Sequence, residues 1–309
     1  MSFYNSYMDT NGILVLVYHS YHKNFAQSFE SHIKYLKNHC QILSSDDFYD
    51  AVALKKEIPQ RSVLITMDDG FYTDYSIAYP ILKAHKAHAV SFIITDPYYT
   101  DVSGKEWWRE VGEVMEIGSH TESHAEIFVS NELTGFIVPV DGQITKMYCM
   151  VKGVDYQPGF PLYQRGPELV NRQVVPPGEL IQAIQETVKG SDFFKEKDWY
   201  ETLKKIVRHN FYPYQYETDE VKEERVRQEI LESKKEIEKT TGKRCRMFAY
   251  PWGVYDEELI DQLKRYDYRG AFTTNEGGNY PGDDPFKINR FVITSEMTVE
   301  DLAAILRVD

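Results

Sequence analysis

Short apolar runs alternate with helical stretches through residues 13–117 of this chain. The runs are rich in β-branched residues and read as buried strands: Ile13–Val17, Val63–Ile65, Ala89–Ile94 and Met115–Ile117. The intervening stretches, such as residues 25–37, carry apolar residues at helical spacing. Strands that alternate with helices of about ten residues form a parallel sheet, so the sequence predicts an α/β fold.

Polar motifs follow two of these predicted strands. The first reads Thr-Met-Asp-Asp-Gly at residues 66–70, and the second reads Gly-Ser-His-Thr-Glu-Ser-His at residues 118–124. The carboxyl edge of a parallel sheet is where active sites are built. One carboxylate and two imidazoles form the ligand set of a hydrolytic divalent-metal site, and a second carboxylate beside them can act as a base. The two motifs therefore predict a metal-dependent hydrolase.

The spacing within the motifs sharpens this prediction. His120 and His124 are four residues apart, so on one helical turn they would share a face and reach one metal. Asp68 and Asp69 are adjacent, so their side chains point in different directions. Taken separately, each motif also has a purely structural interpretation, since Asp-Asp-Gly is common in turns and a histidine pair is common on solvated helices. Their joint occurrence at strand ends favours the site.

These residues resemble the polysaccharide deacetylases, the NodB-homology family of carbohydrate esterases. The first motif of that family reads T-F-D-D-G, with Met67 here in place of Phe, and the second reads H-[ST]-x-x-H. The resemblance implies that Asp68 is the general base. It also implies that one divalent metal ion, by default Zn²⁺, is bound by Asp69, His120 and His124. The fold that it implies is a distorted (β/α) barrel of about seven strands.

A third motif departs from the usual family pattern. In the segment 248–253, which reads Phe-Ala-Tyr-Pro-Trp-Gly, Ala249 stands where most members have an arginine that orients the base. The branch that deacetylates poly-N-acetylglucosamine shares this version, and Arg290 is our candidate for the missing cation. The resemblance also implies substrate-binding roles for Tyr250, Pro251 and Trp252.

The general acid is expected at an unusual place in the chain. The usual histidine motif near the carboxyl end is absent, because no histidine follows His209. The strand at residues 13–17 instead leads into Tyr18-His19, and the same branch resembles a rearranged family in which an early Tyr-His supplies the acid. His19 is thus the predicted acid, with His22 as the second candidate. A histidine after a strand can also be purely structural.

The family pattern is interrupted after His124. The helix that normally follows soon after the second motif is found only at Glu229–Thr241, where Gly242 would end it. We therefore predict a deacetylase barrel at residues 1–127 and 219–309, with an inserted subdomain at 128–218. Because the insertion leaves directly after the metal motif, we expect it to cap or shape the active-site face.

The composition of the insertion leaves two interpretations open. Its first half suggests short strands, and its second half suggests helices at Gly178–Lys189 and Lys195–His209. Its aromatic residues could stack on sugar rings or form a small core of their own: Tyr156, Phe160, Tyr163, Trp199, Phe211, Tyr212, Tyr214 and Tyr216. Arg165 is a candidate substrate-binding residue, and Arg172 could likewise contact an anionic group.

Composition and charge limit the classes of partner that this chain is expected to bind. The 309 residues carry a formal net charge of −13, which argues against a nucleic-acid surface and against anionic membranes. There is no apolar run of 18 residues. The three cysteines are scattered, and the first residues lack the features of a signal peptide, so we expect a cytoplasmic protein. The sequence does not exclude an oligomer.

The function predicted from these observations is metal-dependent N-deacetylation. The substrate would be an N-acetylated sugar of a glycan or glycan precursor, with Asp68 as base and His19 as acid. Two alternatives remain from the sequence. One is another metal-dependent amide or ester hydrolase, such as an O-deacetylase or a deformylase, and the other is a non-catalytic glycan-binding protein.

Overall fold

The computed structural model describes residues 12–20, 24–57, 59–96, 106–112, 114–139, 151–154, 157–209 and 213–306. The chain divides into two compact units, one of Met1–Ser123 with Gln228–Asp309 and one of His124–Arg227. The boundary between Arg227 and Gln228 lies inside helix α7 (Asp219–Thr241), so this helix contributes residues to both units. The second unit thus ends at Arg227, where the sequence suggested a boundary at residue 218.

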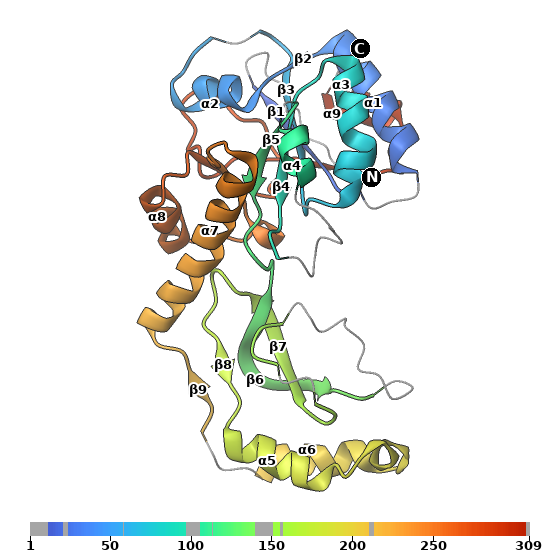
Figure 1. The fold of residues 1–309 in the computed structure, drawn as a ribbon, viewed down its shortest axis with the longest axis vertical. Helices are drawn as coiled ribbons and strands as arrows, with labels where there is room; N and C mark the ends of the chain where they lie inside the picture. The colour runs from blue at the N-terminus through green and yellow to red at the C-terminus, as the bar shows by residue number, and fades with distance from the viewer. Residues whose placement is uncertain are drawn as a thin grey trace. The chain divides into compact units, whose positions relative to one another are not determined.

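A parallel sheet forms the centre of the first unit (Figure 1). Among the described residues it has eight strands, and β2 (Gln41–Ile42) pairs only with β3. The others follow one path in the order β11 (Gly270–Phe272), β10 (Met247–Ala249), β5 (Met115–Ser119), β4 (Ala89–Ile93), β3 (Ser62–Met67), β1 (Leu14–Tyr18) and β12 (Phe291–Ile293). Strands β1, β3 and β4 are buried along their whole length, which explains their continuous apolar runs.

One short segment brings the two ends of this path together. The backbone of residues 285–288 hydrogen bonds to β11, and Phe272 is bridged to Ile288 in parallel. Directly afterwards, β12 pairs with β1 in parallel. The sheet therefore curls into a distorted barrel that is closed by a segment shared between its two edges. This confirms the predicted fold class.

Helices cover the outside of this sheet. They are α1 (Phe25–His39), α2 (Ser45–Ala53), α3 (Tyr79–His85), α4 (Glu106–Val111), α7, α8 (Glu257–Arg265) and α9 (Val299–Leu306). Helix α1 buries Phe29, Ile33 and Leu36, the apolar positions that the helical spacing indicated, and it packs beside α3 and α9 (Figure 1). A π-helical turn at Asp74–Ala78 precedes α3.

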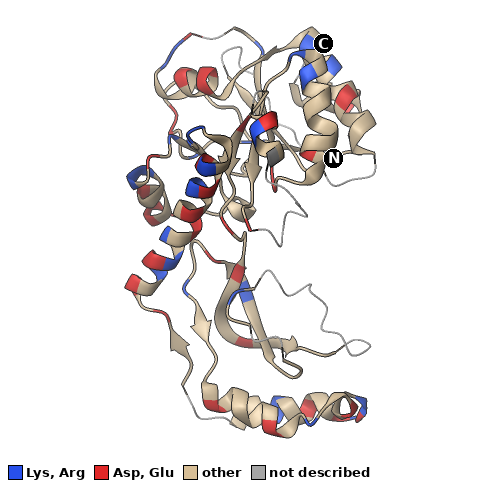
Figure 2. Cartoon of the chain, in the orientation of Figure 1, with Lys and Arg blue, Asp and Glu red and all other residues tan. Residues whose placement is uncertain are grey.

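Helix α7 is the longest described helix and carries mixed charges along its length (Figure 2). Its buried apolar residues include Val226, Ile230 and Ile237. It ends as the sequence indicated, at Gly242, whose φ of +71° is the left-handed conformation that favours glycine. The amide of Gly242 donates a hydrogen bond to the Glu238 carbonyl and so satisfies one of the last carbonyls of the helix.

The second unit contains short strands followed by helices, in the order that the composition suggested. Strands β6 (Glu126–Phe136) and β7 (Pro161–Pro167) form an antiparallel pair, as do β8 (Val174–Val175) and β9 (Gln215–Tyr216). The helices are α5 (Gly178–Thr187), a 3₁₀ turn at Ser191–Lys195 and α6 (Trp199–His209).

Most of the described aromatic residues of the insertion belong to its own core. Phe160 and Tyr163 are buried in one apolar cluster, while Trp199 packs against another and Tyr214 contacts both. Tyr163 and Tyr214 also share a hydrogen bond of 2.8 Å. Tyr216, by contrast, is 56% exposed. The packing interpretation therefore accounts for Phe160, Tyr163, Trp199 and Tyr214.

Several sequence-based expectations fall on residues outside the described ranges: His22, Tyr156, Phe211, Tyr212, and residues 1–11, on which the expected cytoplasmic location depends. Within the described part of the chain, no helix is both long and apolar enough to cross a membrane.

Candidate active site

Three strands deliver chemically active residues to one edge of the barrel. Because β1 and β3 are parallel and Tyr18 is in register with Met67, the residues that follow them, His19 and Asp68, emerge side by side. The amide of Asp68 donates a hydrogen bond of 3.1 Å to the Tyr18 carbonyl. His120 follows β5 at the same edge.

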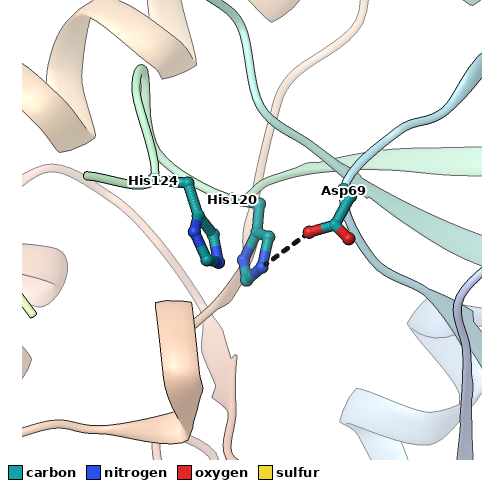
Figure 3. Close-up of side chains that lie close together, drawn as sticks. All are labelled: Asp69, His120 and His124. Atoms are coloured by element: carbon teal, nitrogen blue, oxygen red, sulfur yellow. Dashed lines mark ion pairs between the residues drawn. The ribbon is translucent and has the colours of Figure 1, made fainter. Parts of the chain in front are cut away.

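Asp69, His120 and His124 point toward one another (Figure 3). Each offers one ligand atom, and these atoms all lie within 4.8 Å of one another. His120 Nε2 is 3.6 Å from Asp69 Oδ1. A carboxylate and two imidazoles at this spacing suit a divalent cation such as Zn²⁺, with further positions left for water or substrate.

The two histidines meet through a turn and not through a helix, so the expected helical spacing is wrong here. Residues 120–125 contain no helical turn, and both Thr121 and His124 have left-handed φ values, +72° and +51°. The Thr121 amide donates to Ser119 Oγ. The turn folds the chain back on itself, and this brings the two rings together. Such a conformation cannot be predicted from spacing alone.

The protonation state of His120 suits metal binding. Its Nδ1 is 2.8 Å from the carbonyl oxygen of Ala249, so a proton on Nδ1 is donated there and Nε2 keeps its lone pair toward Asp69. Burial lowers the pKa of His120 and so favours the neutral ring, which is the form that binds metal. Burial, together with the charge of Asp68, raises the pKa of Asp69 to about 7. A divalent cation between these groups would lower the pKa of Asp69 again.

The Asp-Asp-Gly motif forms a tight turn whose geometry explains its glycine. Asp69 and Gly70 both have left-handed backbones, with φ values of +76° and +68°. A Cβ on Gly70 would lie 2.4 Å from Cγ2 of Ile93, so a side chain there would collide with β4. The turn separates the two carboxylates, directing Asp69 to the histidines and Asp68 to a different partner.

That partner is Arg290, the cation that the sequence proposed. Its Nη1 and Nη2 donate hydrogen bonds of 2.7 and 2.8 Å to the two oxygens of Asp68. Arg290 is fully buried, and its Nε donates to the Thr273 carbonyl at 2.7 Å. Burial alone would raise the pKa of Asp68, but the nearby positive charge of Arg290 outweighs it and holds the pKa at about 2. Asp68 is therefore ionised at neutral pH.

His19 is half-buried at the end of β1. It is close enough to Asp68 and His120 for its charge to contribute to lowering the pKa of both. The structure thus brings the predicted acid, the predicted base and one predicted metal ligand to the same edge. Its catalytic role remains a prediction.

The third motif divides into buried and exposed residues. Tyr250 is only 1% exposed, and its hydroxyl donates to the Phe286 carbonyl at 3.0 Å. Its amide donates to the Phe272 carbonyl. Tyr250 and the buried Pro251 therefore pack within the barrel, and a substrate-binding role for them stays a prediction. Trp252 is 47% exposed and stays a candidate for contact with a sugar.

Arg165 belongs to the second unit, on β7, where it pairs with Glu126 at 3.3 Å. Its side chain is 44% exposed. A role in substrate binding stays a prediction for this residue. Arg172 forms an ion pair with Asp219 of α7.

Two residues of α7 that the sequence did not single out support the metal-binding turn. The carboxylate of Glu229 accepts hydrogen bonds from the Ser123 amide at 2.9 Å and from the Ser123 hydroxyl at 3.0 Å. Ser233 Oγ lies 2.7 Å from Ser119 Oγ. Both residues lie in the segment Glu229–Thr241, which the sequence matched to a helix of the family, and that match was the available signal.

Comparison with known proteins agrees with this geometry. The family model described as polysaccharide deacetylase matches residues 55–143 and 203–271, about half of the chain. The chain belongs to the polysaccharide deacetylase family. The matched residues include Asp69, His120, His124 and the third motif, so the predicted family is confirmed.

The relatives of this chain include a member of the poly-N-acetylglucosamine branch, which the third motif indicated. Poly-beta-1,6-N-acetyl-D-glucosamine N-deacetylase of Staphylococcus aureus is 46% identical over 77 residues. That match covers 24% of this chain and 26% of the Staphylococcus protein, so the chain matches about a quarter of that relative's length.

Solved structures of similar fold extend over almost the whole chain. A de-N-acetylase from Aggregatibacter actinomycetemcomitans superimposes with a TM-score of 0.62 at 21% identity, covering 95% of this chain and 99% of that one. IcaB from Ammonifex degensii superimposes with a TM-score of 0.61 at 17% identity, covering 98% and 100%. At these identities the likeness establishes the fold.

Proposed function

We propose that this protein is a metal-dependent N-deacetylase that removes acetyl groups from an N-acetylated glycan. The observation that carries the proposal is the pairing of Asp68 with Arg290 directly beside the cluster of Asp69, His120 and His124. A structural metal site has no need of a second, ionised carboxylate held next to it. A hydrolase uses such a carboxylate as its base.

Each residue of the site has a separate role in the proposed amide hydrolysis. Lewis-acid chemistry that activates water and the acyl carbonyl would come from a divalent cation held by Asp69, His120 and His124. Asp68 takes the proton of the attacking water, and the bidentate contact with Arg290 keeps its carboxylate ionised and oriented. One lone pair on each Asp68 oxygen stays available for that proton, since each oxygen accepts one bond from Arg290.

His19 donates a proton to the departing amine. An amine is a poor leaving group unless it is protonated, so this step separates amide hydrolysis from the hydrolysis of an activated ester. The position of His19, next in space to Asp68 at the edge of the barrel, supports this role.

The test is to measure acetate release from β-1,6-linked N-acetylglucosamine oligosaccharides, chitooligosaccharides and monosaccharide conjugates, with the metal-loaded protein. We expect acetate and free amine in equal amounts from an oligosaccharide. Formate release from N-formyl sugars with no acetate from any N-acetyl sugar would favour a deformylase, and release from O-acetyl sugars alone would favour an O-deacetylase. Binding without turnover would favour a non-catalytic glycan-binding protein.

A further inference from the structure

A third carboxylate lies close behind the metal motif. Asp74 is completely buried, and each of its oxygens accepts a hydrogen bond from a serine. Ser20 Oγ donates to Oδ1 at 2.6 Å, and Ser91 Oγ donates to Oδ2 at 2.8 Å. Ser20 Oγ also lies 2.6 Å from Thr73 Oγ1, so the hydroxyl of Thr73 can donate to it. Ser20, Asp74 and Ser91 are all fully buried.

This cluster connects three separate parts of the barrel edge. Ser20 follows His19 after β1, Asp74 begins the π-helical turn after the Asp-Asp-Gly motif, and Ser91 lies within β4. The turn is closed by a hydrogen bond from the Tyr79 amide to the Asp74 carbonyl. Single π-helical turns are rare and occur frequently at functional sites.

Burial of the Asp74 carboxylate costs free energy. Its hydrogen-bond partners in the described part of the chain are neutral hydroxyl groups, and burial raises the pKa of Asp74 to about 7. An apolar residue of similar size would avoid that cost. Asp74 does something an apolar residue cannot do, which is to hold Ser20 by a short, directional bond.

His19 lies between two anchored points of the backbone. On one side, the Tyr18 carbonyl accepts a hydrogen bond from the Asp68 amide. On the other side, the Ser20 hydroxyl is held by Asp74. We expect loss of the second anchor to loosen the backbone at residue 19 while β1 stays in the sheet.

We infer that Asp74 is a positioning residue that, through Ser20, holds the imidazole of His19 at the active-site edge. The inference rests on the proposed role of His19 as general acid. It makes a selective prediction for Ser20, because loss of its hydroxyl leaves in place the Asp74 carboxyl group that acts on Asp68 and Asp69 and should harm only the step that needs the acid.

Ser91 offers a matched control for this inference. Ser20→Ala and Ser91→Ala each remove one hydroxyl from the same carboxylate, but only Ser20 adjoins His19. For each variant, turnover is measured on an N-acetylated oligosaccharide and on nitrophenyl acetate, whose leaving group departs without a proton. Metal content is measured in parallel. The readout is the ratio of the two rates.

We expect Ser20→Ala to lower the amide rate at least about tenfold relative to the ester rate, as misplacement of a catalytic group does, with metal content unchanged. Asp74→Asn should shift the ratio in the same direction. Ser91→Ala should leave the ratio within about twofold of the parent. In the His19→Ala background, Ser20→Ala should cause no further change in the ratio, because both act through one group.

Two results overturn the inference. One is an equal loss on both substrates in Ser20→Ala, and the other is the same selective loss in Ser91→Ala as in Ser20→Ala. The variant His19→Ala tests the proposed acid itself. If His19 is not the acid, this variant lowers the amide and ester rates equally, and the positioning role of Asp74 is then also rejected. If Asp74→Asn does not fold, the two serine variants still decide the question.

Discussion

Asp68 and Asp69 are neighbours in the chain with opposite electrostatic surroundings. Arg290 holds the pKa of Asp68 at about 2, while burial and the charge of Asp68 raise the pKa of Asp69 to about 7. The left-handed turn at Asp69 separates them. As a result, the protein keeps Asp68 ionised, whereas the charge of Asp69 is available to balance a bound cation.

The metal ligands give the first prediction at the scale of single residues. Asp69→Ala, His120→Ala and His124→Ala should each abolish stoichiometric binding of one divalent ion, because each removes one of three protein ligands. The fold should persist, since the barrel core does not depend on the ion. Elemental analysis and circular dichroism measure the two effects. Full metal occupancy in any one variant would reject that ligand.

The base gives the second prediction. Asp68→Asn should retain the metal and lose most turnover, on the order of 10²–10⁴-fold, because it removes the proton acceptor and leaves the ligands in place. Equilibrium dialysis and initial rates at saturating substrate measure the two quantities. Loss of the metal together with activity would mean that Asp68 is itself a ligand.

Arg290 gives a prediction for pH dependence. In the parent protein the lowered pKa of Asp68 contributes stability that is present above about pH 4, the pKa of an unfolded aspartate, and is lost as the pH falls toward 2. In Arg290→Ala, burial remains without its counter-charge, so the pKa of Asp68 should rise and the acidic limb of kcat/KM should move to higher pH. Removing one partner of a buried pair should also cost ~3–5 kcal/mol of stability.

Profiles of kcat/KM against pH and urea unfolding at two pH values check this prediction. Arg290→Lys is the control, because it keeps the positive charge and loses the bidentate contact. It should shift the acidic limb less than Arg290→Ala. An acidic limb that stays in place in Arg290→Ala would mean that another group controls the ionisation of Asp68.

At the scale of elements, helix α7 supports a loop to which it is not adjacent in sequence. Glu229 accepts two hydrogen bonds from Ser123, and the Glu122 amide donates to the Glu229 carbonyl at 3.2 Å. These contacts hold the chain directly before His124. The helix thus serves the site by fixing the path of the turn and not by supplying a ligand.

Glu229→Ala should therefore weaken metal binding by roughly 10–100-fold, as loss of a residue that supports metal ligands does, without altering helix content. Competition with a chelator gives the affinity. Glu232→Ala is the matched control, since Glu232 lies on the same helix and forms an ion pair with Lys235 at the exposed surface of that helix. Equal affinities in the two variants would show that the turn holds its shape without Glu229.

At the scale of the whole molecule, the apolar clusters of the described residues are separate in the two units. The barrel cluster includes Phe48, Phe92 and Phe272. The insertion has two clusters, of which one includes Phe160 and Tyr163 and the other Leu180 and Leu203. We therefore expect the two units to lose their structure separately.

Tyr163→Ala should destabilise the insertion by ~3–5 kcal/mol, because it creates a cavity within the second unit. It should reduce metal retention less than a barrel variant does, because two of the three proposed ligands, Asp69 and His120, lie in the first unit. Limited proteolysis should then cut within residues 124–227. Phe48→Ala, which creates a cavity in the barrel core, should instead reduce metal retention on heating. If both variants lose metal at the same temperature, the units unfold as one.

Local patterns in the sequence were enough for strands β1, β3, β4 and β5, for several helices and for the family. Apolar runs mark β1, β3, β4 and β5 because burial on both faces leaves no polar positions in a parallel strand. The motif residues follow those runs directly, so their meeting at one edge follows from parallel pairing. The family could be named for the same reason, since its motifs are short and contiguous.

Contacts between positions far apart in the chain could not be predicted from local sequence patterns. Arg290 lies 222 residues after Asp68, and their bidentate pair exists because a short segment bridges the two edges of the sheet. The turn that joins His120 to His124 depends on left-handed backbones, which spacing does not reveal. The aromatic residues of the insertion could be assigned to packing only when their neighbours were known. Strand order, backbone handedness and burial are properties of the folded chain as a whole, and the closest contacts of this site depend on all three.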